Sequence, residues 1–435
     1  MQIYMKSQYG FHTVRKKNLT PSFFCLPAIF ALLLRFMKDM SFNADSGMNI
    51  LFVNSKLSIG KTDSGGAVRT IMMLKALSLT GNVDVISFHE RERCAVEGVN
   101  VIYNGLLDSD HSHKESRFGK LMQLLDPKNP YNYYEKNAGK EEVVDSFVKK
   151  GNYDVIVVRY YYQACECGLL KYAERLVIDV DDSPRESMRL QAVRAGSWRN
   201  RMFIRIQSVL VQKMVDKVSR GIKLSFYSNP DQVKYRNSRY LPNVSPVSGL
   251  SGNVDFHKVP ERILFVGGMG YYPNRIGLEH FVQKIFPIIR LKVPDVRFRV
   301  VGKFFDLELM NRYNAIAGVE CVGFVEDIER EYENCRMVVV PIYQGAGTSI
   351  KALEAMKMRR PLVSTPFGMR GFGAYFLPDK DFLLAETDEE FAEKAVDLLI
   401  DPEKNHAISD SACLNVTRYF SSESFCDIVK SALSE

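Results

Sequence analysis

The segment from Pro341 to Met356 carries the residues best suited to chemistry. It reads PIYQGAGTSIKALEAM, a pattern that predicts the end of a strand, a glycine loop and a helix beginning near Thr348 or Ser349. The free N–H groups of a first helical turn suit a diphosphate. Lys351 lies in that turn, where the helix dipole disfavours a cation, so a bound phosphate explains it better than helix stability does.

Glu354 follows Lys351 by three residues and shares its helix face. A carboxylate at this place can accept two hydrogen bonds from a ribose diol. The alternative is a solvated Lys/Glu pair on the outside of a helix.

A second glycine-rich segment, GKTDSGG at 60–66, lies between the first expected strand and a helix beginning near Ala67. Gly65 and Gly66 would let backbone N–H groups approach a ligand at the helix start. The spacing fits neither a Walker loop nor a Rossmann fingerprint. A plain tight turn explains the segment equally well.

Acidic residues end a strand at Asp179-Val180-Asp181-Asp182. Arg159 ends the preceding strand and can pair with Asp181 or Asp182, as a structural salt bridge or as part of a catalytic site. An Asp-x-Asp pair also suits a divalent metal. That interpretation requires one small mixed domain, so we expect no metal site.

The elements that position these residues alternate between β-branched strands and amphipathic helices, which predicts two doubly wound parallel α/β domains. Ligands bind such sheets at the carboxyl ends of the strands, so we expect a site in the cleft between the domains. The expected strands are 49–54, 83–88, 154–158, 176–180 and 223–227, then 262–266, 297–301, 337–340 and 362–364. The expected helices are 185–218, 276–291, 328–333 and 349–358.

Composition divides the chain further. Leu241-Pro242-Asn243 and the Pro/Ser/Gly-rich stretch after it have linker composition. We expect a dispensable leader at 1–47, a first domain at 48–243, a second domain at 244–405 and final helices at 406–435. The apolar run at 23–34 in the leader has 12 residues, too few for the roughly 20 that span a bilayer.

The net charge of +7 is divided unevenly, with +4 in residues 1–47, +8 in 48–243 and −5 in 244–435. Six arginines lie between Arg185 and Arg205 with one acid among them. Such a stretch suits an anionic membrane surface, although a solvated basic face explains it too. The ordinary composition excludes disordered, collagen-like and disulfide-scaffold classes.

Residues 48–435 resemble the group-1 (family four) glycosyltransferases, which have the two-domain GT-B fold. The segments that carry the resemblance occur in the family's order. They are SGGA at 64–67, LPN at 241–243, FVGGM at 265–269 with YPN at 272–274, VVG at 300–302, GFVED at 323–327, GAGTSIKALEAM at 345–356 and RPLVST at 360–365. A branch of the family shares G-x-G-T-x-x-K.

The resemblance implies that 48–243 is the acceptor-side domain and that 244–405 binds the nucleotide sugar, and it implies roles for individual residues. Gly345, Gly347, Thr348, Ser349 and Lys351 would hold the diphosphate of a sugar nucleotide, and Glu354 would hold its ribose. Gly267 and Gly268 would let the backbone approach the donor. The last helix, near Phe425, would cross back onto the first domain.

This chain departs from the family pattern at three places. Ala346 stands where the family's first Glu of Glu-x(7)-Glu contacts the donor sugar. Gly268 and Asn274 stand near the positions where the family often has an Arg and Lys pair. Lys351 and Arg275 would therefore offset more of the negative charge of the diphosphate. Asp181 falls where many relatives have a His.

The resemblance therefore implies a retaining glycosyltransferase with Lys351, Glu354 and Asp181 as catalytic candidates. Gly65, Gly66, Arg159 and Asp182 would line the acceptor side. We expect no cofactor and no nucleic-acid partner, and a lipid-linked or cell-surface glycan acceptor of polysaccharide biosynthesis. The expected location is the cytoplasm, at the inner face of the membrane. The alternatives are a sugar-nucleotide epimerase and a non-catalytic sugar-nucleotide-binding protein.

Overall fold

The structure, a computed structural model, describes residues 47–61, 65–89, 91–107, 137–250, 252–304 and 306–435. The expected leader therefore lies outside the described residues, except for its last residue. Residues 62–64 of the first glycine loop lie outside them as well.

The first sheet has seven parallel strands in the order β3-β2-β1-β4-β5-β6-β7. Phe52 of β1 pairs with Val85 of β2 on one side and with Val157 of β4 on the other, so the strand order reverses at β1. Five strands were expected. The other two, β3 and β7, are half-buried edge strands, of which β3 (VNVIYN) has only a short apolar run between two asparagines and β7 has only 3 residues. The bounds are β1 (Met48–Asn54), β2 (Gly81–Ser87), β3 (Val99–Asn104), β4 (Val155–Arg159), β5 (Leu176–Asp181), β6 (Leu224–Tyr227) and β7 (Ser238–Tyr240).

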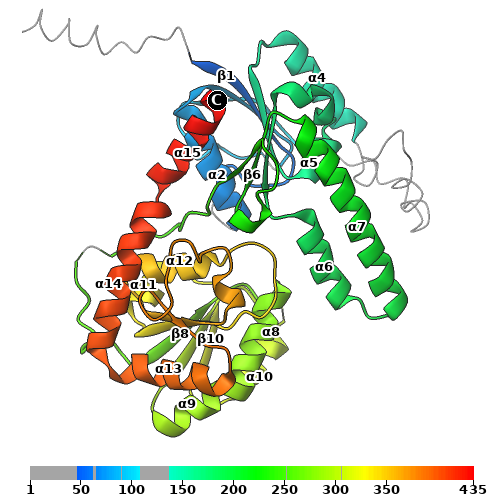
Figure 1. Cartoon of the computed structure of the whole chain (residues 1–435). Helices are drawn as coiled ribbons and strands as arrows, with labels where there is room; N and C mark the ends of the chain where they lie inside the picture. The colour runs from blue at the N-terminus through cyan, green and yellow to red at the C-terminus, as the bar shows by residue number, and fades with distance from the viewer. Residues whose placement is uncertain (1–46, 62–64, 90, 108–136, 251, 305) are drawn as a thin grey trace, which may run out of the picture. The chain divides into compact units, whose positions relative to one another are not determined.

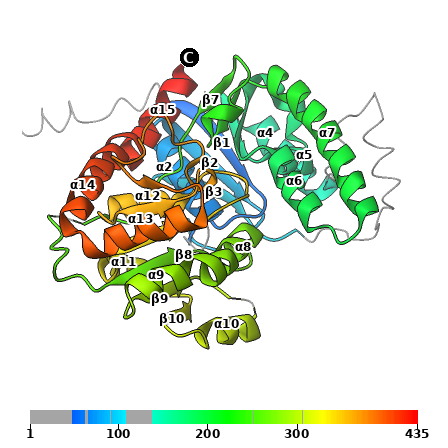
Figure 2. The same cartoon turned by 60° about the horizontal axis from the view of Figure 1, so that its bottom comes forward.

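Helices cover both faces of this sheet (Figures 1 and 2). One face packs on α2 (Gly65–Ser78) and on the last helix, α15 (Ser422–Ser434), whose Phe425 is buried beneath β1 and β4. The other face packs on α4 (Ala138–Lys150), α5 (Tyr161–Glu166) and the second half of α7 (Trp198–Gly221). Continuous apolar strands thus have both faces covered.

The basic stretch expected as one helix forms two. The first, α6 (Pro184–Arg194), ends before Gly196, and α7 begins after Ser197, whose side chain accepts a hydrogen bond from the Asn200 N–H. A glycine followed by a capping serine accounts for the break.

The second sheet has six parallel strands in the order β10-β9-β8-β11-β12-β13. Four of them keep the bounds expected from the sequence. The other two were not expected, because β10 contains glutamate and glycine and β13 has only 2 residues. The bounds are β8 (Arg262–Val266), β9 (Arg297–Val301), β10 (Val319–Gly323), β11 (Met337–Val340), β12 (Leu362–Ser364) and β13 (Leu383–Leu384).

The helix expected at 276–291 is interrupted by a π-helical turn, Phe281–Ile285, between α8 (Tyr272–His280) and α9 (Phe286–Lys292). Pro287 lacks the N–H that a regular α-helix needs at that turn. The remaining helices around this sheet are α10 (Leu307–Asn314), α11 (Ile328–Glu333), α12 (Ile350–Lys357), α13 (Asp388–Ile400) and α14 (Pro402–Tyr419).

Two doubly wound parallel sheets thus confirm the expected fold class, and the single mixed domain that a metal-dependent Asp-x-Asp site would require is wrong. Among the described residues, no helix combines the length and the apolar character needed to cross a bilayer.

Candidate functional site

The glycine loop between β11 and α12 has a backbone that requires glycine. Gly345 has φ 155° and Gly347 has φ 72°, values that L side chains rarely adopt. A Cβ on Gly347 would also lie 2.5 Å from an Asp182 carboxylate oxygen. The helix that follows begins at Ile350, and Ser349 makes no side-chain cap. The first N–H groups of this helix therefore stay available to an anionic ligand, apart from that of Ala352, which donates to the Ser349 carbonyl at 3.1 Å.

Lys351 extends from this helix toward the end of β8. Its Nζ donates to Asn274 Oδ1 at 2.7 Å and lies 4.4 Å from the centre of the Phe265 ring. Burial lowers the pKa of Lys351 to about 7, although the nearby Glu354 carboxylate opposes the shift. An ammonium held in so apolar a place gains from an anionic ligand.

Gly267 meets this lysine from the β8 side. A Cβ there would lie 2.6 Å from Asn274 Nδ2 and 3.0 Å from Lys351 Nζ, so a larger residue would displace both side chains. Gly268 is open on its Cβ side, and its carbonyl accepts from Asn274 Nδ2 at 3.1 Å. The structure thus brings Gly267, Gly268, Asn274 and Lys351 together.

Glu354 lies one turn further along α12 and is buried. Its Oε2 accepts a hydrogen bond from the Tyr332 hydroxyl at 2.7 Å. Burial raises the pKa of Glu354, while the Tyr332 hydrogen bond and Lys351 oppose the shift. Sequence reasoning missed Tyr332, because nothing in the helix 328–333 marks that tyrosine as the partner of a carboxylate.

The expected second cation, Arg275, is exposed and packs on the Tyr272 ring. The arginine that lies at the glycine loop is Arg370, whose Nη2 would be 3.4 Å from a Cβ on Gly345. Its position just after a short 3₁₀ turn, Phe367–Met369, gave no signal in the sequence. Arg370 therefore joins Lys351 as a cation near the loop.

On the first sheet, the strand-end acids form a buried ion-pair network. Asp179 accepts hydrogen bonds from Arg69 and Arg159, with the shortest at 2.7 Å, and Asp181 accepts from Arg159 at 2.8 Å. Burial would raise the pKa of Asp181, but the charges of Arg69 and Arg159 outweigh it and lower that pKa. Arg159 also donates to the Gly66 carbonyl, which fixes the start of α2.

Asp182 lies outside that network. Arg159 pairs with Asp181 and Asp179, whereas Asp182 accepts a hydrogen bond from Ser228 Oγ at 3.4 Å. Burial and the neighbouring Asp181 charge raise the pKa of Asp182 to about 7. Its carboxylate faces Gly347 of the glycine loop.

Other residues of the first sheet's side also reach the glycine loop and α12. The Asn243 amide donates to Thr348 Oγ1 at 3.1 Å. A Cβ on Gly65 would lie 3.1 Å from Ile350 Cδ1. The carboxyl ends of β5 and β11 therefore meet at one site, with helix N–H groups, Lys351, Arg370 and Asp182 around it.

The comparisons with known proteins agree with this architecture. Residues 260–401 match the model of the family described as glycosyl transferases group 1. That range runs from β8 to α13 and contains Gly267, Lys351 and Glu354. An uncharacterized 44.6 kDa protein in the cps region of Klebsiella pneumoniae is 26% identical over 161 residues, which are 35% of this chain. The chain thus spans only 41% of that relative.

Solved structures share the fold at low sequence identity. Anabaena HepE in complex with UDP and glucose is 14% identical, with a TM-score of 0.57, over 89% of this chain and 100% of that chain. WaaG, a glycosyltransferase involved in lipopolysaccharide biosynthesis, is 13% identical, with a TM-score of 0.58, over 87% and 99%. The described chain therefore has the GT-B fold, and its residues 260–401 match the group 1 glycosyl transferases in sequence.

Proposed function

We propose that this protein is a glycosyltransferase that moves a sugar from a nucleotide diphosphate sugar to an acceptor held by the first domain. The observation that carries the proposal is the half-buried Lys351 ammonium beside the open start of α12 and the Gly345–Gly347 loop. Helix N–H groups and a desolvated cation together suit a diphosphate. The match over residues 260–401 and the UDP and glucose bound to the similar Anabaena protein support this donor class.

The chemistry follows from where negative charge grows. The bond between the sugar's anomeric carbon and the diphosphate oxygen breaks, and the electron pair stays on the diphosphate. Lys351 and the N–H groups of α12 stabilise that charge without an obligatory metal. The acceptor oxygen attacks the anomeric carbon from the face that the diphosphate leaves, so the anomeric configuration is retained. The proton of the acceptor hydroxyl passes to the leaving diphosphate. This route requires no strong protein base.

Three carboxylates have separate proposed roles. Glu354 is held by Tyr332 and would bind the ribose. Asp182 faces Gly347 from the first sheet and would meet hydroxyl groups of the donor sugar or the acceptor. Asp181 forms an ion pair with Arg159 and would orient the residues at the end of β5.

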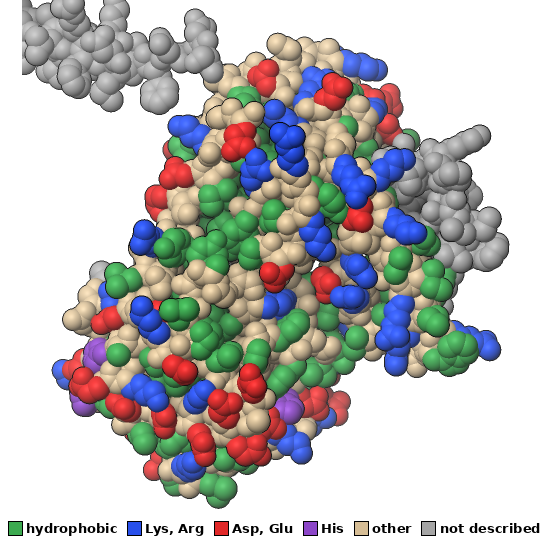
Figure 3. Space-filling view, viewed as in Figure 1, with side chains coloured by type: hydrophobic (Ala, Val, Ile, Leu, Met, Phe, Trp, Pro, Cys, Tyr) green, Lys and Arg blue, Asp and Glu red, His purple; other side chains and the backbone are tan. Residues whose placement is uncertain are grey.

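The acceptor side suggests a membrane-linked glycan. Large apolar side chains are exposed at the start of α7, where Trp198 is 71% exposed and Met202 is 53% exposed. Ile206 and Val209 continue the same helix face. Lys and Arg side chains gather over α6 and α7, while acids gather over the second sheet's helices (Figure 3). Such a helix suits an anionic bilayer, which supports the proposal that the protein works at the inner face of the membrane.

Vesicle co-sedimentation of the full chain tests this membrane contact. We expect binding to phosphatidylglycerol vesicles that weakens with salt. The Trp198→Ser, Met202→Ser double variant should lose about tenfold or more in vesicle affinity, because two apolar side chains buried in the bilayer contribute about 1.5–3 kcal/mol each. Leu291→Ser with Leu414→Ser is the matched control, since both leucines are also exposed. Equal binding to neutral vesicles, or an equal loss in the control, would contradict the proposal.

Turnover with a panel of nucleotide sugars tests the function itself. Release of nucleoside diphosphate that depends on a membrane or glycan acceptor supports transfer. Consumption of the donor without any acceptor indicates an epimerase instead. Donor binding that never leads to turnover indicates a binding protein. Lys351→Met serves as the inactive control in each assay.

A further inference from the structure

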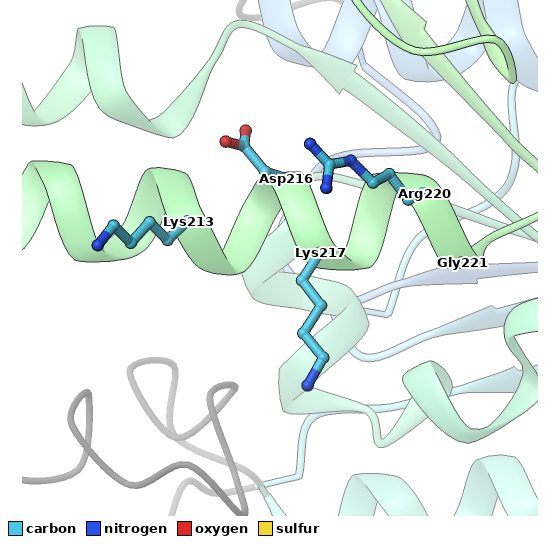
Figure 4. Close-up of a pocket in the computed structure, with 5 residues that line it drawn as sticks. All are labelled: Lys213, Asp216, Lys217, Arg220 and Gly221. Carbon is cyan, nitrogen blue, oxygen red and sulfur yellow. The ribbon is translucent and has the colours of Figure 1, made fainter.

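A basic groove lies at the end of the first sheet where strand β6 begins. It is a hollow of ≈ 780 Å³ between the end of α7, the start of β6, the β6–β7 connection and the end of α15, where Glu435 lines it. A second hollow of ≈ 460 Å³ runs along α7 and shares Arg220 with it; Figure 4 shows Lys213, Lys217 and Arg220 along that helix. The cations that line the larger hollow, and that define the basic groove, are Arg220, Lys223, Lys234, Arg236 and Arg239.

The basic groove is separate from the candidate site. Lys223 immediately precedes β6, whereas Ser228 follows β6 and contacts Asp182. A strand of 4 residues extends over about 13 Å, at about 3.3 Å per residue. The groove and the site therefore lie at opposite ends of the same strand, and the groove is not another part of the donor site.

The charges of the basic groove are largely uncompensated. Among the described residues, Arg239 pairs with Glu435, but the other four cations have no ion pair. The remaining nearby acid, Asp216, accepts hydrogen bonds from the hydroxyl of Tyr235 and from Gln212. The exposed cations repel one another, and a bound anion would relieve that repulsion.

The walls of the basic groove are fixed by hydrogen bonds. Asn237 Nδ2 donates to the Ser219 carbonyl at 2.7 Å and to the Ile222 carbonyl at 2.6 Å. These carbonyls end α7, so the amide covers the negative end of the helix dipole, which would otherwise repel an anion. That dipole favours Arg220 in the last turn. It does not explain Lys234 and Arg236, which come from another segment.

We propose that the basic groove binds a ligand that carries two or more phosphate groups. Guanidinium groups bind phosphate oxygens in pairs, and lysines add charge without fixed geometry. Four unpaired cations exceed the charge of a single phosphate, so one phosphate group would leave part of the repulsion in place. The same chemistry is available from a soluble polyphosphate and from neighbouring lipid headgroups, and the two arms of the experiment separate these sources.

The test is titration of the full chain with sodium tripolyphosphate by calorimetry, and with phosphatidylglycerol vesicles by co-sedimentation. The test variant is Arg220→Gln, Lys234→Gln, Arg236→Gln. The matched control is Lys150→Gln, Lys284→Gln, Lys380→Gln, which removes the same charge at exposed lysines elsewhere. We expect the test variant to lose at least about tenfold in affinity, because each cation near a phosphate surface contributes roughly fivefold. The control should stay within about twofold.

Each outcome decides the proposal. Loss in the tripolyphosphate arm alone assigns the basic groove to soluble phosphates, and loss in the vesicle arm assigns it to headgroups. Equal losses in both triple variants would show that binding follows net charge, which overturns the proposal. Unchanged binding in the test variant would overturn it too. Because all six substituted residues are exposed, melting curves should match the wild type.

Discussion

Replacing Lys351 with methionine should separate function from stability. Methionine keeps most of the length of the side chain and removes the charge that we propose stabilises the leaving diphosphate. Turnover should fall by a factor on the order of 10²–10³, the range for one lost electrostatic donor of this kind. The fall should appear in kcat, because the charge on the diphosphate grows toward the transition state.

The same change should leave the fold as stable as before, or make it more stable. Burial lowers the pKa of Lys351 to about 7, which sets an upper bound of about 5 kcal/mol on the cost of holding the charge, at about 1.4 kcal/mol per tenfold. The side chain keeps some exposure, so water reduces that cost to about 1–3 kcal/mol. Losing the hydrogen bond to Asn274 costs about 1 kcal/mol. The net change at pH 6 is therefore about 0–2 kcal/mol in favour of the variant.

The effect of Lys351→Met on stability should depend on pH, in a direction set by the lowered pKa of Lys351. Below pH 7 the lysine is charged in both the folded and the unfolded protein, and the folded protein carries the full cost of burial. Above pH 7 the folded protein releases the proton while the unfolded chain keeps it, so wild-type stability rises toward pH 10. The advantage of Lys351→Met should thus shrink between pH 6 and pH 9.

The assay combines steady-state kinetics with melting curves for the wild type and Lys351→Met at pH 6 and pH 9. We expect Tm at pH 6 to rise by up to about 4 °C or to stay equal. Full activity in the variant would refute the role of Lys351. Activity that falls only in step with a lower Tm would refute it too, because the lysine would then be structural.

Three further predictions concern the same site. Glu354→Gln should raise the donor KM by about tenfold with little change in kcat. Tyr332→Phe should raise the donor KM less, because it removes one hydrogen bond worth about 1 kcal/mol. An unchanged KM in both variants would show that Glu354 does not bind the donor. Donor affinity should fall by up to about tenfold per pH unit above pH 7, because free Lys351 loses its proton there and a bound diphosphate restores it; a flat profile in calorimetry from pH 6 to pH 9 would contradict this. EDTA should leave turnover largely intact, whereas complete, magnesium-reversible loss would shift attention to Asp181 and Asp182.

The sequence alone determined the second sheet most sharply. Strands β8, β9, β11 and β12 keep their expected bounds, because each is a short apolar run that is buried on both faces and is bounded by polar residues. Edge strands such as β3 and β7 carry little of that pattern, since one side of each lies at the margin of the sheet. Gly196 and Ser197 indicate the break between α6 and α7, but the longer basic pattern around them predicted one continuous helix.

For the site, the sequence determined the loop and the helix that follows it, because glycine spacing and a strand-to-helix switch are local features. It placed Lys351 and Glu354 on one helix for the same reason. Only the tertiary structure decided their partners. Asn274 and Tyr332 lie 77 and 22 residues away along the chain, and such contacts leave no periodic trace in a single sequence.

The tertiary structure also decided how the charged residues are used. Asp181 and Asp182 are neighbours in sequence, yet one is neutralised by Arg159 and the other faces Gly347 with a raised pKa. Arg275 was expected at the site and Arg370 lies there instead. Ionisation and charge pairing depend on distance and burial, which are set when β5, β11 and α12 come together. The sequence therefore supplied the residue types, and the packing of distant segments assigned each charge its environment.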